Sequence, residues 1–128
     1  MKKIQLAAGI LTAAALLLLG SCTSEKKDYI LATGGTSGTY YPFGGAIANI
    51  WNTKLENMNV TAQATGASAE NLRLINKGEA EFGTVQNDVM DYAYHGTALF
   101  DGEVLGNIMT IGTLYPEVVQ IAVSKESG

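Results

Sequence analysis

The sequence predicts an α/β fold in which a mostly parallel sheet is covered by helices on both faces. Two observations lead to this fold class. Short apolar runs of strand length end in loops rich in glycine, threonine or serine, and apolar residues at helical spacing follow each loop. This order occurs three times between residues 29 and 95. Strands that alternate with helices favour parallel pairing, because each crossover helix returns the chain to the same edge of the sheet.

Before the first of these units, the chain begins with a predicted targeting sequence. Met1–Lys3 is basic, and Ile4–Leu19 follows without a charge. This apolar stretch is shorter than the ~20 residues that span a bilayer, so we predict a secretory signal over residues 1–21. The run Leu19–Cys22 resembles the lipobox of bacterial lipoproteins, which implies cleavage before Cys22 and lipidation of its thiol. The alternative is an uncleaved membrane anchor.

Composition limits the classes of function. The 128 residues include eight basic and twelve acidic side chains, for a net charge of −4, and removal of the signal with its two lysines leaves six against twelve, or −6. This balance argues against nucleic-acid binding, which needs a basic surface. The single cysteine excludes an internal disulfide and a multi-cysteine metal site. Residues 22–27 are polar and predict a tether, so we place the folded unit at residues 28–128, outside the cytoplasmic membrane.

The first unit predicts a strand, a glycine-rich loop and a helix. Tyr29–Thr33 is an apolar run of strand length, and the loop Gly34–Tyr40 follows it. Tyr41-Pro42 can open a helix, because proline suits the first helical turn. The buried face of that helix is predicted from apolar residues at helical spacing, namely Ile47, Ile50, Trp51 and Leu55.

The second unit has the same order. Val60–Gln63 predicts a strand, and a turn leads to a helix that runs from the N-cap Ser68 to Lys77. Leu72 and Ile75 are expected on its core face. Gly78 supplies the stop, because glycine readily adopts the left-handed conformation that ends helices.

The third unit and the remainder of the chain are shorter. Residues 81–85 predict a strand, and Gln86–Asp88 caps a helix that His95-Gly96 ends. Residues 97–106 show no clear period. Ile108–Leu114 and Val118–Ser124 predict two further strands.

The three loops are expected to meet at one place. The carboxyl ends of parallel strands lie at one edge of a sheet, and ligands bind there. Gly34–Tyr40, residues 65–68 and Gln86–Asp88 each lead into a helix N-terminus, with unpaired N–H groups and a partial positive charge. The edge is therefore suited to a small anion, even without an arginine.

Catalytic and cofactor functions find no support in the motifs. The glycine-rich loop lacks the lysine of a P-loop and the G-x-G-x-x-G spacing of a dinucleotide site. A hydrolase would use Ser37, Asp88 and His95, but the G-x-S-x-G elbow is absent. His95 is the only histidine and is expected at a helix end, so no zinc site can be assembled. We therefore expect no enzyme, metal or cofactor, and the residues alone leave a binding loop and a structural turn equally open.

Three segments resemble one family in order and spacing. The runs Ala32–Asn52, Thr65–Ile75 and Val85–Asp88 are similar to the loops of TAXI-family solute receptors, the extracytoplasmic binding proteins of TRAP transporters. The resemblance covers residues 28–128. It implies a periplasmic-binding-protein-like (type II) fold that closes on a small organic anion, a dicarboxylate or an amino acid such as glutamate. It also implies delivery of that ligand to TRAP membrane subunits for import.

The resemblance also implies the ligand-binding residues, which are Gly35, Thr36, Ser37, Gly38, Thr39, Tyr40, Ser68, Gln86, Asn87 and Asp88. Members of the family have two lobes and are more than twice as long. The expectation is therefore a truncated first lobe with the second lobe missing, which binds poorly by itself. The alternative is a lipid-anchored surface interaction protein that uses a partial binding-protein fold.

Overall fold

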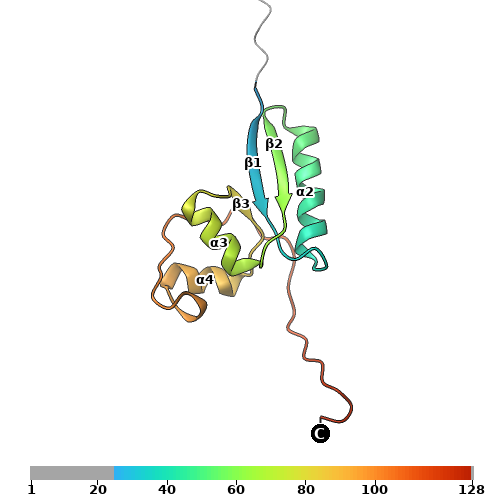
Figure 1. The fold of residues 1–128 in the computed structure, drawn as a ribbon, viewed down its shortest axis with the longest axis vertical. Helices are drawn as coiled ribbons and strands as arrows, with labels where there is room; N and C mark the ends of the chain where they lie inside the picture. Colours follow the sequence, from blue (N-terminus) through green and yellow to red (C-terminus); the bar gives the residue numbers. More distant parts are fainter. Residues whose placement is uncertain (1–24, 128) are drawn as a thin grey trace, which may run out of the picture.

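The structure, a computed structural model, describes residues 25–127 and confirms the predicted α/β class. The predicted signal and Cys22 lie outside the described residues. Three parallel strands form the sheet in the order β2-β1-β3, and helices follow each strand (Figure 1). The elements are β1 (Lys27–Ala32), α2 (Tyr40–Lys54), β2 (Met58–Gln63), α3 (Ser68–Lys77), β3 (Phe82–Gly83), α4 (Asn87–His95) and the 3₁₀ turn η1 (Ala98–Phe100).

Strand β1 lies at the centre of the sheet. It pairs with β2 along its whole length, so that Tyr29 lies opposite Val60, but it pairs with β3 only at its carboxyl end. The predicted strand at residues 81–85 is thus reduced to two residues. Since β2 and β3 lie on opposite sides of β1 and such crossovers are right-handed, α2 and α3 are directed to opposite faces of the sheet. Figure 1 shows this arrangement.

Small residues bring α2 close to the sheet. Gly44 and Ala48 are its buried residues, and Ala48 packs with Leu31 and Val60 in one of two core clusters. Ile47 and Trp51 pack against this cluster as predicted, but the prediction was wrong for Ile50 and Leu55, which are 56% and 43% exposed. The reason is geometric, because Ile50 is two residues, or about 200°, from Ala48 around the helix.

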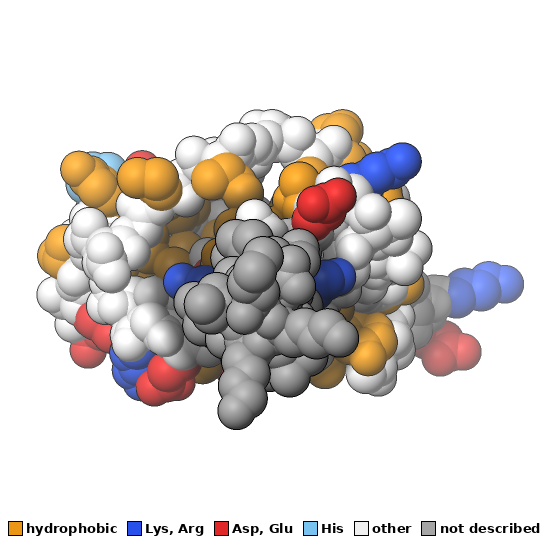
Figure 2. Space-filling model, turned by 90° about the horizontal axis from the view of Figure 1, so that it is seen from above, with side chains coloured by type: hydrophobic (Ala, Val, Ile, Leu, Met, Phe, Trp, Pro, Cys, Tyr) orange, Lys and Arg blue, Asp and Glu red, His pale blue; other side chains and the backbone are white. Residues whose placement is uncertain are grey.

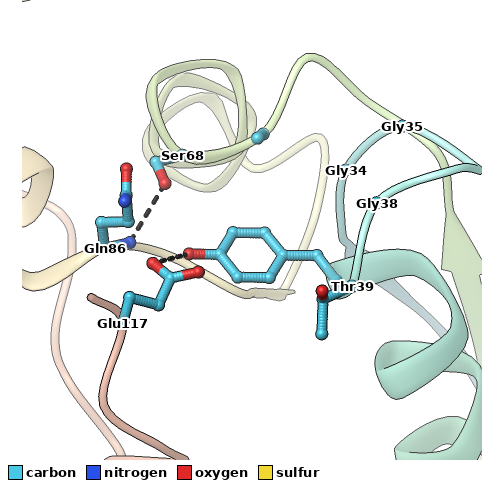
Figure 3. Close-up of a pocket in the computed structure, with 9 residues that line it drawn as sticks. Gly34, Gly35, Gly38, Thr39, Ser68, Gln86 and Glu117 are labelled. Carbon is cyan, nitrogen blue, oxygen red and sulfur yellow. Dashed lines mark hydrogen bonds between the residues drawn. The ribbon is translucent and has the colours of Figure 1, made fainter. Parts of the chain in front are cut away.

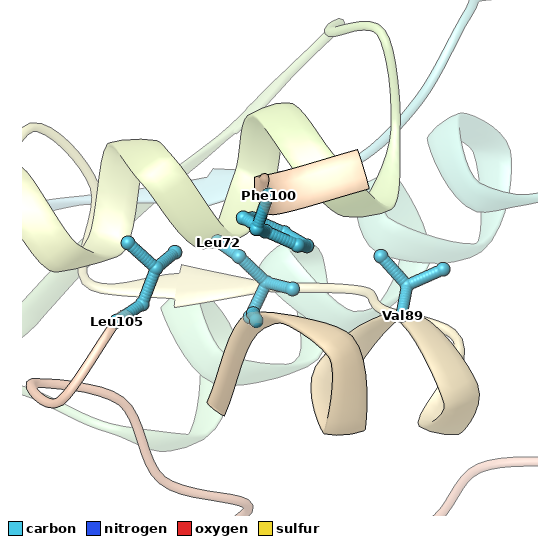
Figure 4. Packing of buried hydrophobic residues seen from close by; sticks show 5 residues of the cluster. Leu72, Val89, Phe100 and Leu105 are labelled. Carbon is cyan, nitrogen blue, oxygen red and sulfur yellow. The ribbon is translucent and has the colours of Figure 1, made fainter. Parts of the chain in front are cut away.

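The second core cluster lies between α3 and α4. It contains Leu72, Val89, Ala93, Phe100 and Leu105 (Figure 4), of which Leu72 was predicted; Ile75 is half-buried. Both helices end as expected, at Gly78 and Gly96, whose φ angles of 74° and 66° are left-handed.

The two strands predicted after α4 are absent from the structure. Residues 103–127, here called the tail, form no strand, and Ile111, Val119 and Ile121 are 75%, 89% and 87% exposed. Both segments are apolar and contain β-branched residues, but a strand forms only where its backbone pairs with a neighbouring strand, and neither segment pairs with β2 or β3. The start of the tail is packed through the buried side chain of Leu105, whose N–H donates to the carbonyl oxygen of Ala93 over 2.9 Å. The tail makes a further contact at Tyr115, whose ring lies edge-on to that of Phe43 with 5.4 Å between the ring centroids.

The surface mixes apolar and charged side chains. In Figure 2, hydrophobic side chains are dispersed over the visible face, with basic and acidic side chains scattered between them. Among residues 25–127, no helix has the length and apolarity that a membrane span requires.

Candidate functional site

A cavity of about 260 Å³ opens at the carboxyl end of the sheet, where the loops after all three strands meet. The chain passes from β1 to β2 on one side of β1, and then crosses to β3 on the other side of β1. The crevice at such a switch point is the usual ligand site of open α/β sheets. In Figure 3 the glycine-rich loop stands on one side, Ser68 and Gln86 on the other, and Glu117 reaches in from the tail. The lining residues are Gly34, Gly35, Gly38, Thr39, Tyr40, Ala67, Ser68, Gln86 and Glu117.

The glycine-rich loop is held by a turn of its own. The Gly38 N–H donates to the carbonyl oxygen of Gly35 over 2.9 Å, and the Gly34 carbonyl oxygen accepts from the Thr65 N–H at 3.3 Å. Within residues 25–127, the N–H groups of Gly35 and Thr39 have no hydrogen-bond acceptor. These two donors are therefore available to a bound polar group.

Tyr40 and Glu117 form the side-chain pair of the cavity. The phenol O–H of Tyr40 donates to Oε2 of Glu117 over 2.7 Å, and it joins the first residue of α2 to the tail. Burial raises the pKa of Tyr40 well above its ordinary value of 10, and the hydrogen bond to Glu117 and its negative charge raise it further. The phenol thus remains a neutral hydrogen-bond donor at physiological pH.

Ser68 connects α3 to α4 instead of capping its own helix. The N-cap of α3 is Ala67, and Ser68 is its first helical residue, which corrects the predicted cap. Its buried hydroxyl accepts from the N–H of Gln86, the N-cap of α4, at 3.0 Å. The starts of both helices are thereby fixed side by side, with their positive dipole ends near the carboxylate of Glu117 (Figure 3).

Ala67 is a strained residue at the edge of the cavity. Its φ of 69° and ψ of −150° lie in a region that glycine favours, and such strain often marks functional sites. The N–H of Ala67 donates to Oγ1 of Thr65 at 3.1 Å, and the preceding Gly66 N–H donates to Oε2 of Glu70 at 2.7 Å. These bonds hold the turn in place.

Six of the ten predicted ligand-binding residues line the cavity. Gly35, Gly38, Thr39, Tyr40, Ser68 and Gln86 are brought together there, whereas Thr36, Ser37, Asn87 and Asp88 lie outside the lining and are exposed.

Three lining residues were not among the predicted ligand-binding residues. Gly34 and Ala67 belong to the loops that were predicted to meet at the site, but only their neighbours Gly35 and Ser68 were predicted to bind the ligand. Glu117 is 77 positions from Tyr40, and no local pattern in Tyr115-Pro116-Glu117 marks it as part of the site.

The residues of the hydrolase alternative are not brought together. Asp88 and His95 lie near opposite ends of α4, about 10 Å apart along the helix axis. Oδ1 of Asp88 accepts from the N–H of Val89 at 2.9 Å, and Nδ1 of His95 lies 3.0 Å from the carbonyl oxygen of Asp91. Ser37 belongs to the loop before α2 and does not line the cavity. The arrangement offers donors for binding and no assembled nucleophile and base.

A known protein family matches most of the chain. The model of the NMT1-like family matches residues 31–128, which extend from the end of β1 through all of the loops that line the cavity.

Proposed function

The chain belongs to the NMT1-like family of periplasmic solute-binding proteins, and from this premise we propose that its cavity binds a small organic anion for import. Membership gives the chain an extracytoplasmic solute-binding role. Our proposal adds the ligand class, a dicarboxylate or an amino acid such as glutamate, and delivery to the membrane subunits of a TRAP-type transporter, as the TAXI resemblance implies. It also adds an anchor, the lipidated Cys22, which holds the protein at the membrane.

The observation that carries the proposal is the meeting of three loops at one cavity. Backbone donors of the glycine-rich loop lie across from the starts of α3 and α4, and both backbone N–H groups and helix N-termini favour a bound carboxylate. Its volume of about 260 Å³ lies below the ~300–1,000 Å³ of pockets that take drug-sized ligands. A small solute fits this size.

A titration followed by amide NMR spectra tests the proposal, because it detects weak binding and identifies the residues involved. We expect small carboxylic acids and amino acids to shift the amide signals of Gly35, Thr39 and Gln86 in a saturable way. Gly78 and Gly96, at the far ends of α3 and α4, serve as internal controls and should not move. If none of these compounds shifts the cavity signals, or if the shifts gather away from the cavity, the proposal is wrong.

A surface interaction protein is the second candidate, and the tail favours it. Val118, Val119, Ile121 and Val123 are each more than 70% exposed, which is unusual for large apolar side chains so close together in the sequence and typical of a protein contact. Replacing Val119 and Ile121 with serine separates the two candidates. The receptor proposal expects the cavity titration to remain unchanged, whereas the interaction proposal expects loss of binding to a partner protein.

A further inference from the structure

We propose that Glu117 selects the ligand, and that the cavity takes a molecule carrying both a carboxylate and a protonated amine. The inference rests on the proposed function, since it concerns the same cavity. It starts from the position of one carboxylate, which extends from the tail into the lining beside Tyr40. A receptor for simple dianions has no evident use for a negative charge at this point.

Within the proposed ligand class, the charge of the lining disfavours a dicarboxylate that lacks a positive group. Of the lining residues in the described part of the chain, Glu117 alone carries a formal charge at neutral pH, and no lysine or arginine belongs to the lining. A dianion would bring two negative charges to a cavity that already holds one, with helix ends and neutral donors as its only compensation. A ligand with an ammonium group would bring its positive charge to Glu117.

The geometry leaves the carboxylate free to accept such a group. Oε2 accepts from the Tyr40 phenol at 2.7 Å, and within residues 25–127 no hydrogen bond occupies Oε1. The phenol therefore orients the carboxylate and leaves one oxygen for the ligand. The glycine-rich loop across the cavity offers the N–H groups of Gly35 and Thr39. Donors on one side and an acceptor on the other match the two charged groups of an α-amino acid.

Three compounds that share one carbon skeleton test this selection. L-Glutamate carries the ammonium group, 2-oxoglutarate replaces it with a keto oxygen, and glutarate has neither. Each is titrated into the purified protein, into Glu117→Gln and into Glu126→Gln, with binding followed by the amide signals of the cavity. The glutamine at 117 keeps an oxygen for the Tyr40 phenol and removes the charge. Glu126→Gln makes the same change further along the tail, outside the lining, and is the matched control.

We expect the unaltered protein and Glu126→Gln to prefer glutamate over 2-oxoglutarate and glutarate by about tenfold, the size of one charged hydrogen bond. In Glu117→Gln, glutamate should weaken by about tenfold and the other two should bind equally or more tightly. The assignment of Glu117 is overturned if the unaltered protein shows no such preference, if Glu117→Gln retains it, or if that variant binds all three compounds more tightly. Failure of all three compounds to bind the unaltered protein overturns the proposed function itself, and the assignment with it.

Discussion

The side-chain amide of Asn71 donates a hydrogen bond to the carbonyl oxygen of Thr33 over 2.6 Å, and so ties α3 to the end of β1. The same nitrogen donates to the Thr84 carbonyl oxygen at 2.8 Å, just after β3, and Oδ1 accepts from the Thr65 hydroxyl at 2.6 Å. Asn71 is fully buried. One side chain thus fixes the three loop starts from which the cavity is built.

Replacing Asn71 with alanine should destabilise the protein strongly. Each of the three groups it now satisfies would lose a partner, and an unsatisfied buried polar group costs about 1–3 kcal/mol. We expect the free energy of unfolding to fall by roughly 3 kcal/mol, measured by urea denaturation with Trp51 fluorescence. Asn76→Ala, at an exposed hydrogen bond on the same helix, is the control and should cost less than about 1 kcal/mol. Equal losses in the two variants would contradict the role given to Asn71.

Two adjacent glycines in α2 provide a matched pair. A Cβ added at Gly44 would collide with the Cγ2 atom of Thr33, whereas one added at Gly45 meets nothing within 4 Å. Gly44→Ala should therefore destabilise the protein by about 1–3 kcal/mol through overpacking. Gly45→Ala should stabilise it by roughly 0.5–1 kcal/mol, because alanine favours the helix. Urea denaturation of both variants measures the difference, and the same sign for both would refute the packing of α2 on β1.

Much of the fold was predictable, because local signals and tertiary contacts agree. Gly78 and Gly96 end their helices as their backbone freedom predicts. Leu72 is buried as its helical spacing predicts. The predicted face of α2 was wrong at Ile50, because close packing of Gly44 on β1 outweighs the burial of a larger apolar residue.

The tail and part of the site depend on distant contacts that no local pattern contains. Val118–Ser124 has the composition of a strand, but its pairing is decided by a partner elsewhere. Serine is a common helix N-cap, but the hydroxyl of Ser68 instead accepts a hydrogen bond from the N–H of Gln86, eighteen residues away. Glu117 lies in the cavity because the tail passes beside Tyr40, a contact that the local sequence does not indicate.

Ser68 lines the cavity and Ser37 does not, so replacing each with alanine tests where the site ends. Ser68→Ala removes the acceptor of the Gln86 N–H, so we expect a loss of about 1 kcal/mol in stability. We also expect weaker ligand binding, because the start of α4 is no longer held. Ser37→Ala should change neither quantity, since Ser37 is exposed and outside the lining. Urea denaturation and the amide titration measure both, and a binding defect in Ser37→Ala would enlarge the site beyond the cavity.

Cys22 is predicted to carry the lipid anchor. It is the only cysteine, so its replacement removes every thiol that could be acylated. Labelled palmitate should be incorporated into the protein in its native host and not into Cys22→Ala. Ser21→Ala keeps a small residue before the cysteine and should retain the label. Absence of label from the unaltered protein, or its persistence in Cys22→Ala, would exclude the anchor.

The Tyr40–Glu117 pair predicts a loss of stability at alkaline pH. The pKa of Tyr40 in the folded protein is raised above its ordinary value of 10, so the unfolded chain releases this proton first as pH rises. The contribution of Tyr40 is therefore fully present below pH 10 and declines above it. Tyr40→Phe lacks both the proton and the hydrogen bond to Glu117, which is worth about 1 kcal/mol.

Urea denaturation at pH 7, 9 and 11 measures this linkage. At pH 7 and 9 we expect the unaltered protein to be more stable than Tyr40→Phe by about 1 kcal/mol. At pH 11 the difference should shrink, because folding then requires the unfolded chain to take up a proton at Tyr40. Taking the difference between the two proteins cancels the titration of the other tyrosines, which both share. A difference that stays constant from pH 7 to pH 11 would show that Tyr40 is not shielded by the contact with the tail.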